Sequence, residues 1–276
     1  MYIRIVENIY NLFLYKNISK VRREYMNKII EAKMLSKTFS NDCVQQHVLK
    51  NLDIEIYEGD FTVIMGASGS GKSTLMYALS GIDKPTLGSI TCKGEEITKL
   101  NNDQLAIFRR KYSGFVFQQN YLNDSMSVLD NILATGLLVN KNRKEVAKKA
   151  KELLIRVGIK EESWGKFPTQ LSGGEAQRVS IVRALINSPS IVFADEPTGA
   201  LNSTSAEAVL DIMTEINEQG QSIVMVTHDM KTARRANRIL YLKDGVIIDE
   251  LKLGKYVKNS ETRHKDLREF LKRMGW

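Results

Sequence analysis

The sequence predicts an α/β protein built around a mostly parallel sheet. Short apolar runs alternate along the chain with segments of helical pattern, and no internal repeat or low-complexity linker divides them. The apolar runs cover residues 61–65, 113–117, 190–194 and 222–226, and the clearest helical patterns cover residues 73–79 and 205–216. Such alternation favours parallel strands joined by crossover helices. Ligand sites in these folds lie at the carboxyl ends of the strands, so the residues that follow each apolar run are the first candidates for function.

Length and composition are those of an ordinary globular protein. The chain has 276 residues, of which 43% are hydrophobic, enough for a sizeable core in one large or two small domains. No stretch approaches the roughly eighteen uninterrupted apolar residues that cross a bilayer, and there is no signal-peptide cleavage site. The two cysteines, Cys43 and Cys92, are isolated, which suits a reducing compartment. We therefore expect a cytoplasmic protein.

The net charge of +8 lies at the two ends of the chain. Residues 1–25 hold five basic and two acidic side chains, and residues 252–276 hold eight and three, which leaves residues 26–251 neutral. A nucleic-acid-binding protein is expected to carry its basic surface on the folded body. We therefore interpret the excess charge as solvated termini and expect no nucleic acid among the partners.

The first 25 residues pose a separate question. Met26 opens MNKIIEAKMLSKTFS, a natural first strand, and residues 22–25 read RREY, which a purine-rich tract of the ribosome-binding type would encode. We interpret residues 1–25 as an upstream segment translated by mistake, with Met26 as the native start. A flexible amphipathic arm is the alternative. N-terminal sequencing of the native protein separates the two, because an arm would yield a peptide spanning residues 20–30.

A phosphate-binding loop follows the first apolar run. Residues 66–74 read GASGSGKST, which fits GxxxxGK[ST] and lies between a strand and a helix that stops near Gly81. Glycines let backbone N–H groups turn toward phosphate oxygens, and the start of the helix adds partial positive charge. Lys72 supplies a charge for the β- and γ-phosphates, and the Ser73 hydroxyl is placed to bind Mg²⁺. The nucleotide-binding candidates in this loop are Gly66, Ala67, Ser68, Gly69, Ser70, Gly71, Lys72, Ser73 and Thr74.

An acidic pair follows the run at residues 190–194. Asp195, at the strand end, is placed to reach the metal directly or through water, and Glu196 comes next at the turn. A phosphate loop needs a second metal ligand and a group that activates water. We therefore assign Asp195 to the metal and Glu196 to the general base. Without the phosphate loop, an acidic pair before proline would be read as a capped strand end.

Two further polar residues follow apolar runs. His228, one of three histidines, lies in IVMVTHD directly after the apolar run and Thr227, and Gln118 ends GFVFQ. In a parallel sheet the strand before His228 would lie beside the strand before Asp195, so the histidine ring would stabilise charge near a γ-phosphate. The Gln118 amide is a candidate ligand for Mg²⁺ or for the attacking water. Both roles depend on the phosphate loop, because a lone histidine or glutamine at a strand end is more often structural.

The segment LSGGEAQRV, residues 171–179, combines a helix cap with two glycines. Ser172 and Glu175 fit a capping box. Gly173 and Gly174 cost helix stability and are useful where another group must approach the backbone closely. We therefore expect the start of this helix to bind an anion. Because the phosphate loop already serves the chain's own nucleotide, the anion most economically belongs to a second copy.

Together the motifs resemble those of the nucleotide-binding subunit of ABC transporters. The resemblance rests on GASGSGKST, VFQQ, LSGGEAQRV, VFADEPTGALN and VTHD in this order, and it covers about residues 29–250. It implies a phosphate-loop NTPase (RecA-like) core with an N-terminal antiparallel β subdomain and an inserted helical subdomain. The ABC ATPase domain would span residues 26–251 and the helical subdomain about 119–185. A groove beside Gln118 would receive the coupling helix of a permease.

The resemblance also implies how the protein works. Two copies would pair head to tail around two ATP molecules with Mg²⁺, each ATP lying between the phosphate loop of one copy and residues 172–175 of the other. Phe39, in SKTF ahead of the first strand hairpin, matches the aromatic residue that stacks on adenine. Asn202 departs from the family, which usually has an aspartate here at the dimer interface. Asparagine keeps the shape and drops a charge, so we expect hydrolysis to survive with altered coupling.

The flanking segments narrow the resemblance further. Residues 88–100, 108–119 and 167–185 resemble ATPases of the macrolide-efflux, lipoprotein-releasing and bacitracin-resistance type. There the permease is a separate integral membrane chain, which implies a homodimer at the cytoplasmic face of the membrane that exports, or gives resistance to, antimicrobial peptides or lipid-like compounds. A non-transport ABC ATPase acting on ribosomes or DNA is the alternative, but such relatives carry two domains in one chain or long coiled-coil insertions. A small-molecule phosphoryl transferase would have no use for LSGGE.

Residues 252–276 form a basic C-terminal tail. Its apolar residues recur at helical spacing, which predicts a short amphipathic helix that packs on its own domain rather than on a membrane. These residues are Leu267, Phe270, Leu271 and Met274. The lysine-rich stretch at residues 141–154 is expected to be a solvated helix face.

Overall fold

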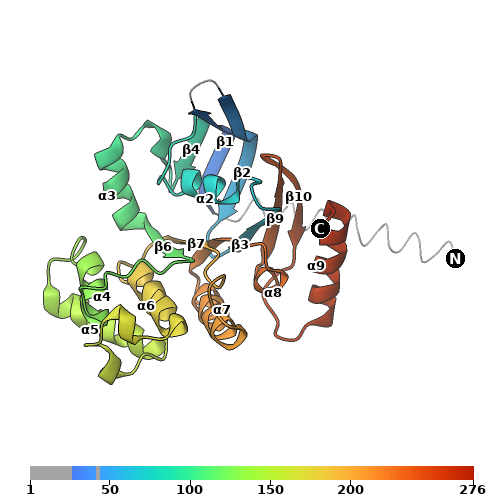
Figure 1. Ribbon diagram of the computed structural model, residues 1–276. Coiled ribbons are helices and arrows are strands. Elements are labelled where there is room, and N and C mark those ends of the chain that lie inside the picture. Colours follow the sequence, from blue (N-terminus) through green and yellow to red (C-terminus); the bar gives the residue numbers. More distant parts are fainter. Residues whose placement is uncertain (1–26, 42–43) are drawn as a thin grey trace.

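Two sheets with helices packed around them make up the part of the chain that the computed structural model describes, residues 27–41 and 44–276 (Figure 1). The described residues do not include residues 1–25, the proposed start at Met26 or Cys43. Cys92, within them, is a buried free thiol whose pKa burial raises to about 12.

The smaller sheet is antiparallel and has the strand order β2-β1-β4-β5. Its first strand starts close to the position expected from the sequence, and it is long because it pairs along its length with β2 and along part of it with β4. The strands are β1 (Lys28–Asn41), β2 (Val44–Tyr57), β4 (Leu87–Cys92) and β5 (Glu95–Glu96). This sheet is the antiparallel subdomain that the resemblance implied.

The larger sheet has the order β10-β9-β3-β8-β7-β6, parallel except for the β9–β10 hairpin. The strands are β3 (Phe61–Met65), β6 (Ser113–Phe117), β7 (Ile191–Asp195), β8 (Ser222–Val226), β9 (Arg238–Lys243) and β10 (Val246–Lys252). The predicted mostly parallel α/β fold is confirmed. Phe117 pairs with Asp195 and Asp195 with Val226, so the three strand ends that precede the candidate site residues meet at one sheet edge.

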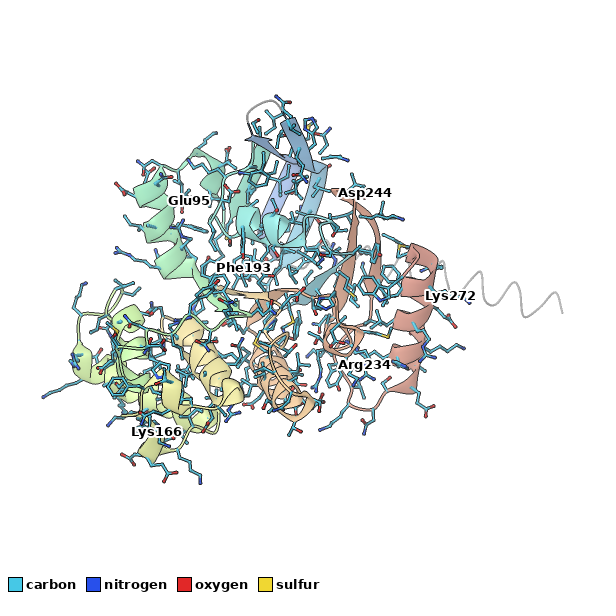
Figure 2. The ribbon with its side chains drawn as sticks, in the orientation of Figure 1. Glu95, Lys166, Phe193, Arg234, Asp244 and Lys272 are labelled. Carbon is cyan, nitrogen blue, oxygen red and sulfur yellow. The ribbon has the colours of Figure 1, made fainter. Side chains whose placement is uncertain are left out.

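Both faces of the parallel sheet are buried, because successive side chains of a strand point to opposite faces. Phe193 belongs to an apolar cluster shared with the antiparallel sheet and α2, whereas its neighbour Ala194 belongs to a second cluster shared with α7 and α9. Phe193 lies near the centre of the molecule (Figure 2), stacked on Phe115 with ring centroids 5.7 Å apart. The sheet is thus a middle layer between two cores.

Helices start where the sequence supplies capping side chains. Seven of the eight α-helices in the described ranges have an N-cap side chain that accepts a backbone hydrogen bond, which satisfies a free N–H at the helix start. The exception is α2, which begins after Gly71. The helices are α2 (Lys72–Leu79), α3 (Asn102–Tyr112), α4 (Val128–Gly136), α5 (Arg143–Arg156), α6 (Gly173–Leu185), α7 (Ser203–Glu218), α8 (Met230–Ala233) and α9 (Glu261–Met274). Short 3₁₀ turns are η1 (Ile97–Lys99), η2 (Glu161–Ser163) and η3 (Pro168–Gln170).

Helices α4, α5 and α6 form a lobe beside the parallel sheet (Figure 1) and share an apolar cluster of their own. On the other side, the predicted C-terminal helix is α9, whose Leu267, Phe270 and Leu271 are buried in the second core and whose Met274 packs against it. No helix in the described ranges combines the length and apolar content required to cross a bilayer.

Candidate active site

The loop between β3 and α2 has the conformation that its glycines permit. Gly66, Gly69 and Gly71 all have positive φ, which a residue with a side chain rarely adopts. A Cβ on Gly66 would lie 2.1 Å from the carbonyl oxygen of Leu242, and a Cβ on Gly71 would lie 3.0 Å from that of Val48. The loop is therefore pressed against β9 and β2, and only glycine fits at these two positions.

The start of α2 is left free for an anion. Its N-cap, Gly71, has no side chain to bond the first N–H groups of the helix, unlike the other α-helices of the described ranges. The hydroxyl oxygen of Ser70, inside the loop, is buried and has no hydrogen-bond partner. Buried donors without partners and an uncapped helix start are what a phosphate group would satisfy. The loop therefore fits a polyphosphate.

Lys72 is the cation of this loop. The residue is buried, and its ammonium donates to the carbonyl of Ala67 at 2.8 Å. Burial lowers the pKa of Lys72, while the carboxylates of Glu196 and Asp195 act in the opposite direction and favour the charged form. Among the described residues Lys72 has no direct ion-pair partner, although Asp195 and Glu196 act on its charge. Such a buried cation is suited to bind the oxygens of a phosphate chain.

Asp195 is held by two residues of α2. The Ser73 hydroxyl donates to Oδ1 at 3.1 Å, and the Tyr77 hydroxyl donates to Oδ2 at 2.9 Å. Burial, followed by the bond to Asp195, raises the pKa of Tyr77 to about 12, so the phenol stays protonated and acts as the donor. The sequence reasoning missed Tyr77. Its signal was present in the spacing, because residues four apart share a helix face and Ser73 was already assigned to the same metal as Asp195.

The donor set fits Mg²⁺. Ser73 and Asp195 offer oxygen ligands, which this hard cation prefers, and Mg²⁺ in nucleotide sites usually takes few protein ligands and completes its shell with phosphate oxygens and water. The described residues contain no cluster of three or more His, Cys, Asp or Glu side chains that would hold a metal alone. A site of this kind would therefore bind the metal together with a nucleotide.

Glu196 and His228 face each other at the same sheet edge. Glu196 has φ 44°, a left-handed conformation that is rare for a residue with a side chain, and its N–H donates to the carbonyl of Val226 at 2.9 Å. Its Oε1 lies 2.8 Å from Nδ1 of His228. Because a carboxylate only accepts, the imidazole donates from Nδ1. The positive φ of Glu196 and its contact with His228 thus occur together, directly after the end of β7.

Gln118 reaches the edge of this group without joining it. It follows Phe117, the partner of Asp195 in the sheet, and its amide nitrogen lies 3.0 Å from the position a Cβ on Gly199 would take. No hydrogen bond in the described part of the chain links Gln118 to Ser73 or Asp195. The structure therefore brings Lys72, Ser73, Asp195, Glu196 and His228 together and leaves Gln118 exposed beside them.

The capping box expected at residues 172–175 is present. The Ser172 N–H donates to Oε2 of Glu175 at 2.9 Å, and the Glu175 N–H donates to Oγ of Ser172 at 3.3 Å. The backbone bond from Ser172, and then its side-chain bond, lower the pKa of Glu175. Ser172 and Gly173 are exposed, so the helix start is open to a group from outside.

Gly174 does not fit the expectation that both glycines are needed for a group from outside the chain. Gly174 is buried, and a Cβ on it would lie 2.7 Å from Oγ of Ser205 on α7. The close approach that requires glycine at this position therefore comes from the chain itself and not from an outside anion. Gly173 has only Leu201, at 3.5 Å, near the corresponding point, and remains open.

The helix start at Ser172 lies apart from the phosphate loop. Figure 1 shows α2 beside the antiparallel sheet and α6 in the lobe of α4 and α5. No hydrogen bond or ion pair joins residues 66–74 to residues 172–175 in the described part of the chain. One copy of the protein therefore keeps the starts of α2 and α6 separate.

Phe39 lies within β1, near its end, and not ahead of the first hairpin as expected. It pairs with Gln46, two residues before Val48, whose carbonyl borders the phosphate loop at Gly71. The ring is 45% exposed, and the Lys37 ammonium lies 4.8 Å from its centroid. An exposed ring close to the loop is available for stacking on a flat base.

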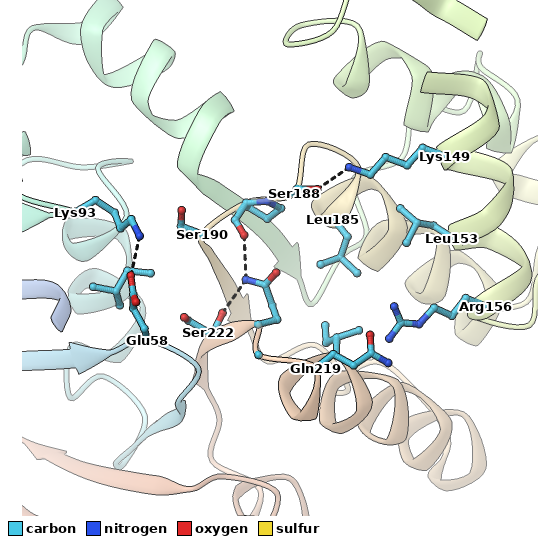
Figure 3. Close-up of a pocket in the computed structure, with 15 residues that line it drawn as sticks. Glu58, Lys93, Lys149, Leu153, Arg156, Leu185, Ser188, Ser190, Gln219 and Ser222 are labelled. Atoms are coloured by element: carbon cyan, nitrogen blue, oxygen red, sulfur yellow. Dashed lines mark hydrogen bonds and ion pairs between the residues drawn. The ribbon is translucent and has the colours of Figure 1, made fainter. Parts of the chain in front are cut away.

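A cavity of about 440 Å³ lies at the opposite sheet edge and does not belong to this site. It is bordered by Ser190 and Ser222, at the amino ends of β7 and β8, whereas the candidate residues follow their carboxyl ends. Figure 3 shows Lys149 directed from α5 toward Ser188, with which it makes a 2.6 Å hydrogen bond. Lys149 is partly buried and is an exception to the solvated lysine face expected on this helix.

Comparison with known proteins gives independent evidence for the family of this chain. A family model described as ABC transporter matches residues 49–199. The chain is 42% identical over 248 residues to the bacitracin export ATP-binding protein BceA of Halalkalibacterium halodurans, across 90% of this chain and 96% of that protein. It is 46% identical to the macrolide export ATP-binding/permease protein MacB of Escherichia coli across 81% of this chain but only 34% of MacB, so it spans about a third of that relative.

The fold also has close counterparts among solved structures. A dimeric ATP-binding cassette in a post-hydrolysis state, bound to ADP and Pi, superposes with a TM-score of 0.76 at 38% identity. The match covers 82% of this chain and all of the other. A dimeric bacterial ABC transporter cassette superposes with a TM-score of 0.75 at 39% identity. This chain therefore has the same fold as cassettes that bind nucleotide.

Proposed function

The chain belongs to the ABC transporter family, and on that premise we propose that two copies hydrolyse two ATP molecules held between them, each site being completed by the other copy. The observation that carries this proposal is the uncapped start of α2, with Lys72 beside it and the Ser73–Asp195 and Glu196–His228 contacts at the adjacent strand ends. The matched cassettes are dimeric, which supports the pairing.

Each nucleotide is bound mainly by the phosphate loop. The N–H groups at the start of α2 and the Lys72 ammonium bind the β- and γ-phosphates, and the exposed ring of Phe39 stacks on adenine. Bound Mg²⁺, held by Ser73 and Asp195 with Gln118 close by, would neutralise charge on the phosphate oxygens. Ser172, Gly173 and Glu175 of the second copy close the site from the opposite side.

Glu196 acts as the general base that orients water against the γ-phosphate. His228 holds the Glu196 carboxylate through Nδ1. The same ring can donate to the γ-phosphate from Nε2 only when it is doubly protonated or has left Glu196, because a neutral imidazole has one N–H. His228 is therefore placed to switch between positioning the base and stabilising developing charge.

The work of hydrolysis is transmitted to a permease on another polypeptide. The relative that this chain matches over nearly its whole length is named as an ATP-binding protein of bacitracin export, and the longer relative joins an ATP-binding part to a permease in one name. We extend this to a subunit at the cytoplasmic face of the membrane that serves export of, or resistance to, antimicrobial peptides or lipid-like compounds. Hydrolysis by the copurified complex, measured with candidate peptides and lipids, would identify the substrate.

The Glu196→Gln variant tests the catalytic scheme. It should bind ATP, lose at least about a hundredfold in turnover because the base is absent, and accumulate as a dimer in gel filtration with ATP. Glu152→Gln, on the exposed face of α5, is the control that removes a carboxylate elsewhere and should keep the wild-type rate. A Glu196→Gln protein that hydrolyses ATP at the normal rate would refute the assignment, whatever its oligomeric state.

A further inference from the structure

Both oxygens of the Asp195 carboxylate are bonded from one helix. Ser73 and Tyr77 lie four residues apart on α2 and reach Oδ1 and Oδ2, respectively. A carboxylate held at one oxygen can still rotate about its terminal bond, whose torsional preference is broad. A bond at each oxygen removes that freedom and fixes the direction in which Oδ1 faces.

Tyr77 is itself firmly placed. Its ring packs against the core cluster beneath the antiparallel sheet. Its backbone carbonyl accepts from Ile82 N–H at 3.0 Å, from Asp83 N–H at 3.2 Å and from the Ser80 hydroxyl at 3.1 Å, where α2 ends. The Tyr77 hydroxyl is thus held at Asp195 by a firmly packed part of the structure. A group that orients a metal ligand must itself be held in place.

We propose that Tyr77 is a positioning residue that sets the Asp195 carboxylate for Mg²⁺ binding by holding Oδ2, so that Oδ1 stays on the side of Ser73. This rests on the proposed function, in which Asp195 is a metal ligand. Partners of this kind, one step removed from a metal, fix the orientation of its ligands, and their loss typically lowers metal affinity about 10–100-fold. A phenol that only filled space in the core would have no effect of this kind.

The test compares ATP binding with and without the metal. Isothermal titration calorimetry on the full chain gives the ATP dissociation constant in Mg²⁺ and in EDTA, and the ratio of the two measures the contribution of the metal. Tyr77→Phe should reduce that ratio about tenfold, with affinity in EDTA unchanged, because only the orientation of a metal ligand is lost. The Mg²⁺ concentration for half-maximal hydrolysis should rise in parallel.

Tyr112→Phe is the matched control, because it removes a phenol from the same apolar cluster away from Asp195, and it should leave the ratio unchanged. If Tyr77→Phe is not folded, Tyr77→Leu also lacks the hydroxyl and should give the same loss. An unchanged ratio in a folded Tyr77 variant, or an equal loss in Tyr112→Phe, would overturn the proposal.

Asp195→Asn separates this inference from the function beneath it. If Asp195 is a metal ligand, this variant must lose the effect of Mg²⁺ on ATP binding. Loss in Asp195→Asn together with an unchanged Tyr77→Phe would reject the role of Tyr77 and keep the metal site. A normal Mg²⁺ effect in Asp195→Asn would instead reject the assignment of Asp195, and the role of Tyr77 would fall with it.

Discussion

Single residues at this site act through bonds between positions far apart in the sequence. Ser73 and Asp195 are 122 positions apart and Glu196 and His228 are 32 apart, yet each pair is within hydrogen-bond distance. The effect of Asn202, which departs from the family pattern, can be judged from its hydrogen bonds in the same way. Asn202 is the N-cap of α7, and its side chain accepts from the Ser205 N–H at 2.9 Å.

Asn202→Asp should change the hydrolysis rate by less than about a hundredfold, which corresponds to roughly 2.7 kcal/mol. Asparagine and aspartate cap helices about equally well, so the start of α7 should be preserved while a charge is added. Steady-state ATPase assays measure the effect. Asn202→Ala is the control, since it removes the cap and should cost about 1 kcal/mol of stability in urea unfolding. A larger rate change in Asn202→Asp would show that the missing charge governs the chemistry itself.

At the scale of elements, packing against an apolar core shows which segments belong to the folded domain. The C-terminal tail has the composition of a solvated basic segment, but α9 buries three apolar side chains against β9, β10 and their neighbours. Arg263, also buried, donates to the carbonyls of Leu253, Gly254 and Lys255 and to two carbonyls just after α8, those of Arg234 and Ala236. Helix α9 is therefore part of the folded domain.

Phe270→Ala should lower the free energy of unfolding by about 3–5 kcal/mol, because the ring is 1% exposed and its removal leaves a cavity. Urea unfolding followed by circular dichroism gives the value. Phe167→Ala makes the same truncation at a ring that is 46% exposed and should cost much less. Equal midpoints for Phe270→Ala and the wild type would mean that α9 does not stabilise the domain.

At the scale of the whole molecule, the two helix starts that we propose to contact the nucleotide lie in separate lobes. The phosphate loop belongs to the sheet core and Ser172 to the lobe of α4, α5 and α6. In the proposed dimer a second copy closes the site, with the loop of each copy facing the lobe of the other. This arrangement predicts how substitutions in one copy affect hydrolysis at the site that it shares with the other copy.

Ser172→Arg should leave ATP binding nearly intact and reduce turnover at least about a hundredfold, because the arginine would occupy the space of the other copy's nucleotide. Ser127→Arg removes an equivalent cap from α4 in the same lobe and should retain turnover. Lost ATP binding in a folded Ser172→Arg variant would contradict the assignment.

Mixing two inactive variants gives the sharper result. A Ser172→Arg copy paired with a Lys72→Ala copy contains one site with both defects and one with neither, so mixed dimers should regain part of the hydrolysis. Recovery measured across mixing ratios would follow the fraction of mixed dimers. If each copy held a complete site of its own, no mixture would recover activity.

Local patterns in the sequence were enough to predict the fold class, the phosphate loop, the capping box at Ser172 and Glu175 and a short amphipathic helix within residues 252–276. Each depends on local spacing, on a helix period or on the few residue types that a turn accepts. Tertiary structure alone decided that Tyr77 holds Asp195, that Gly174 is closed by Ser205 and that Glu196 meets His228 through a left-handed backbone. These contacts join distant segments whose approach depends on how the sheet and its two cores pack, and no local pattern encodes that geometry.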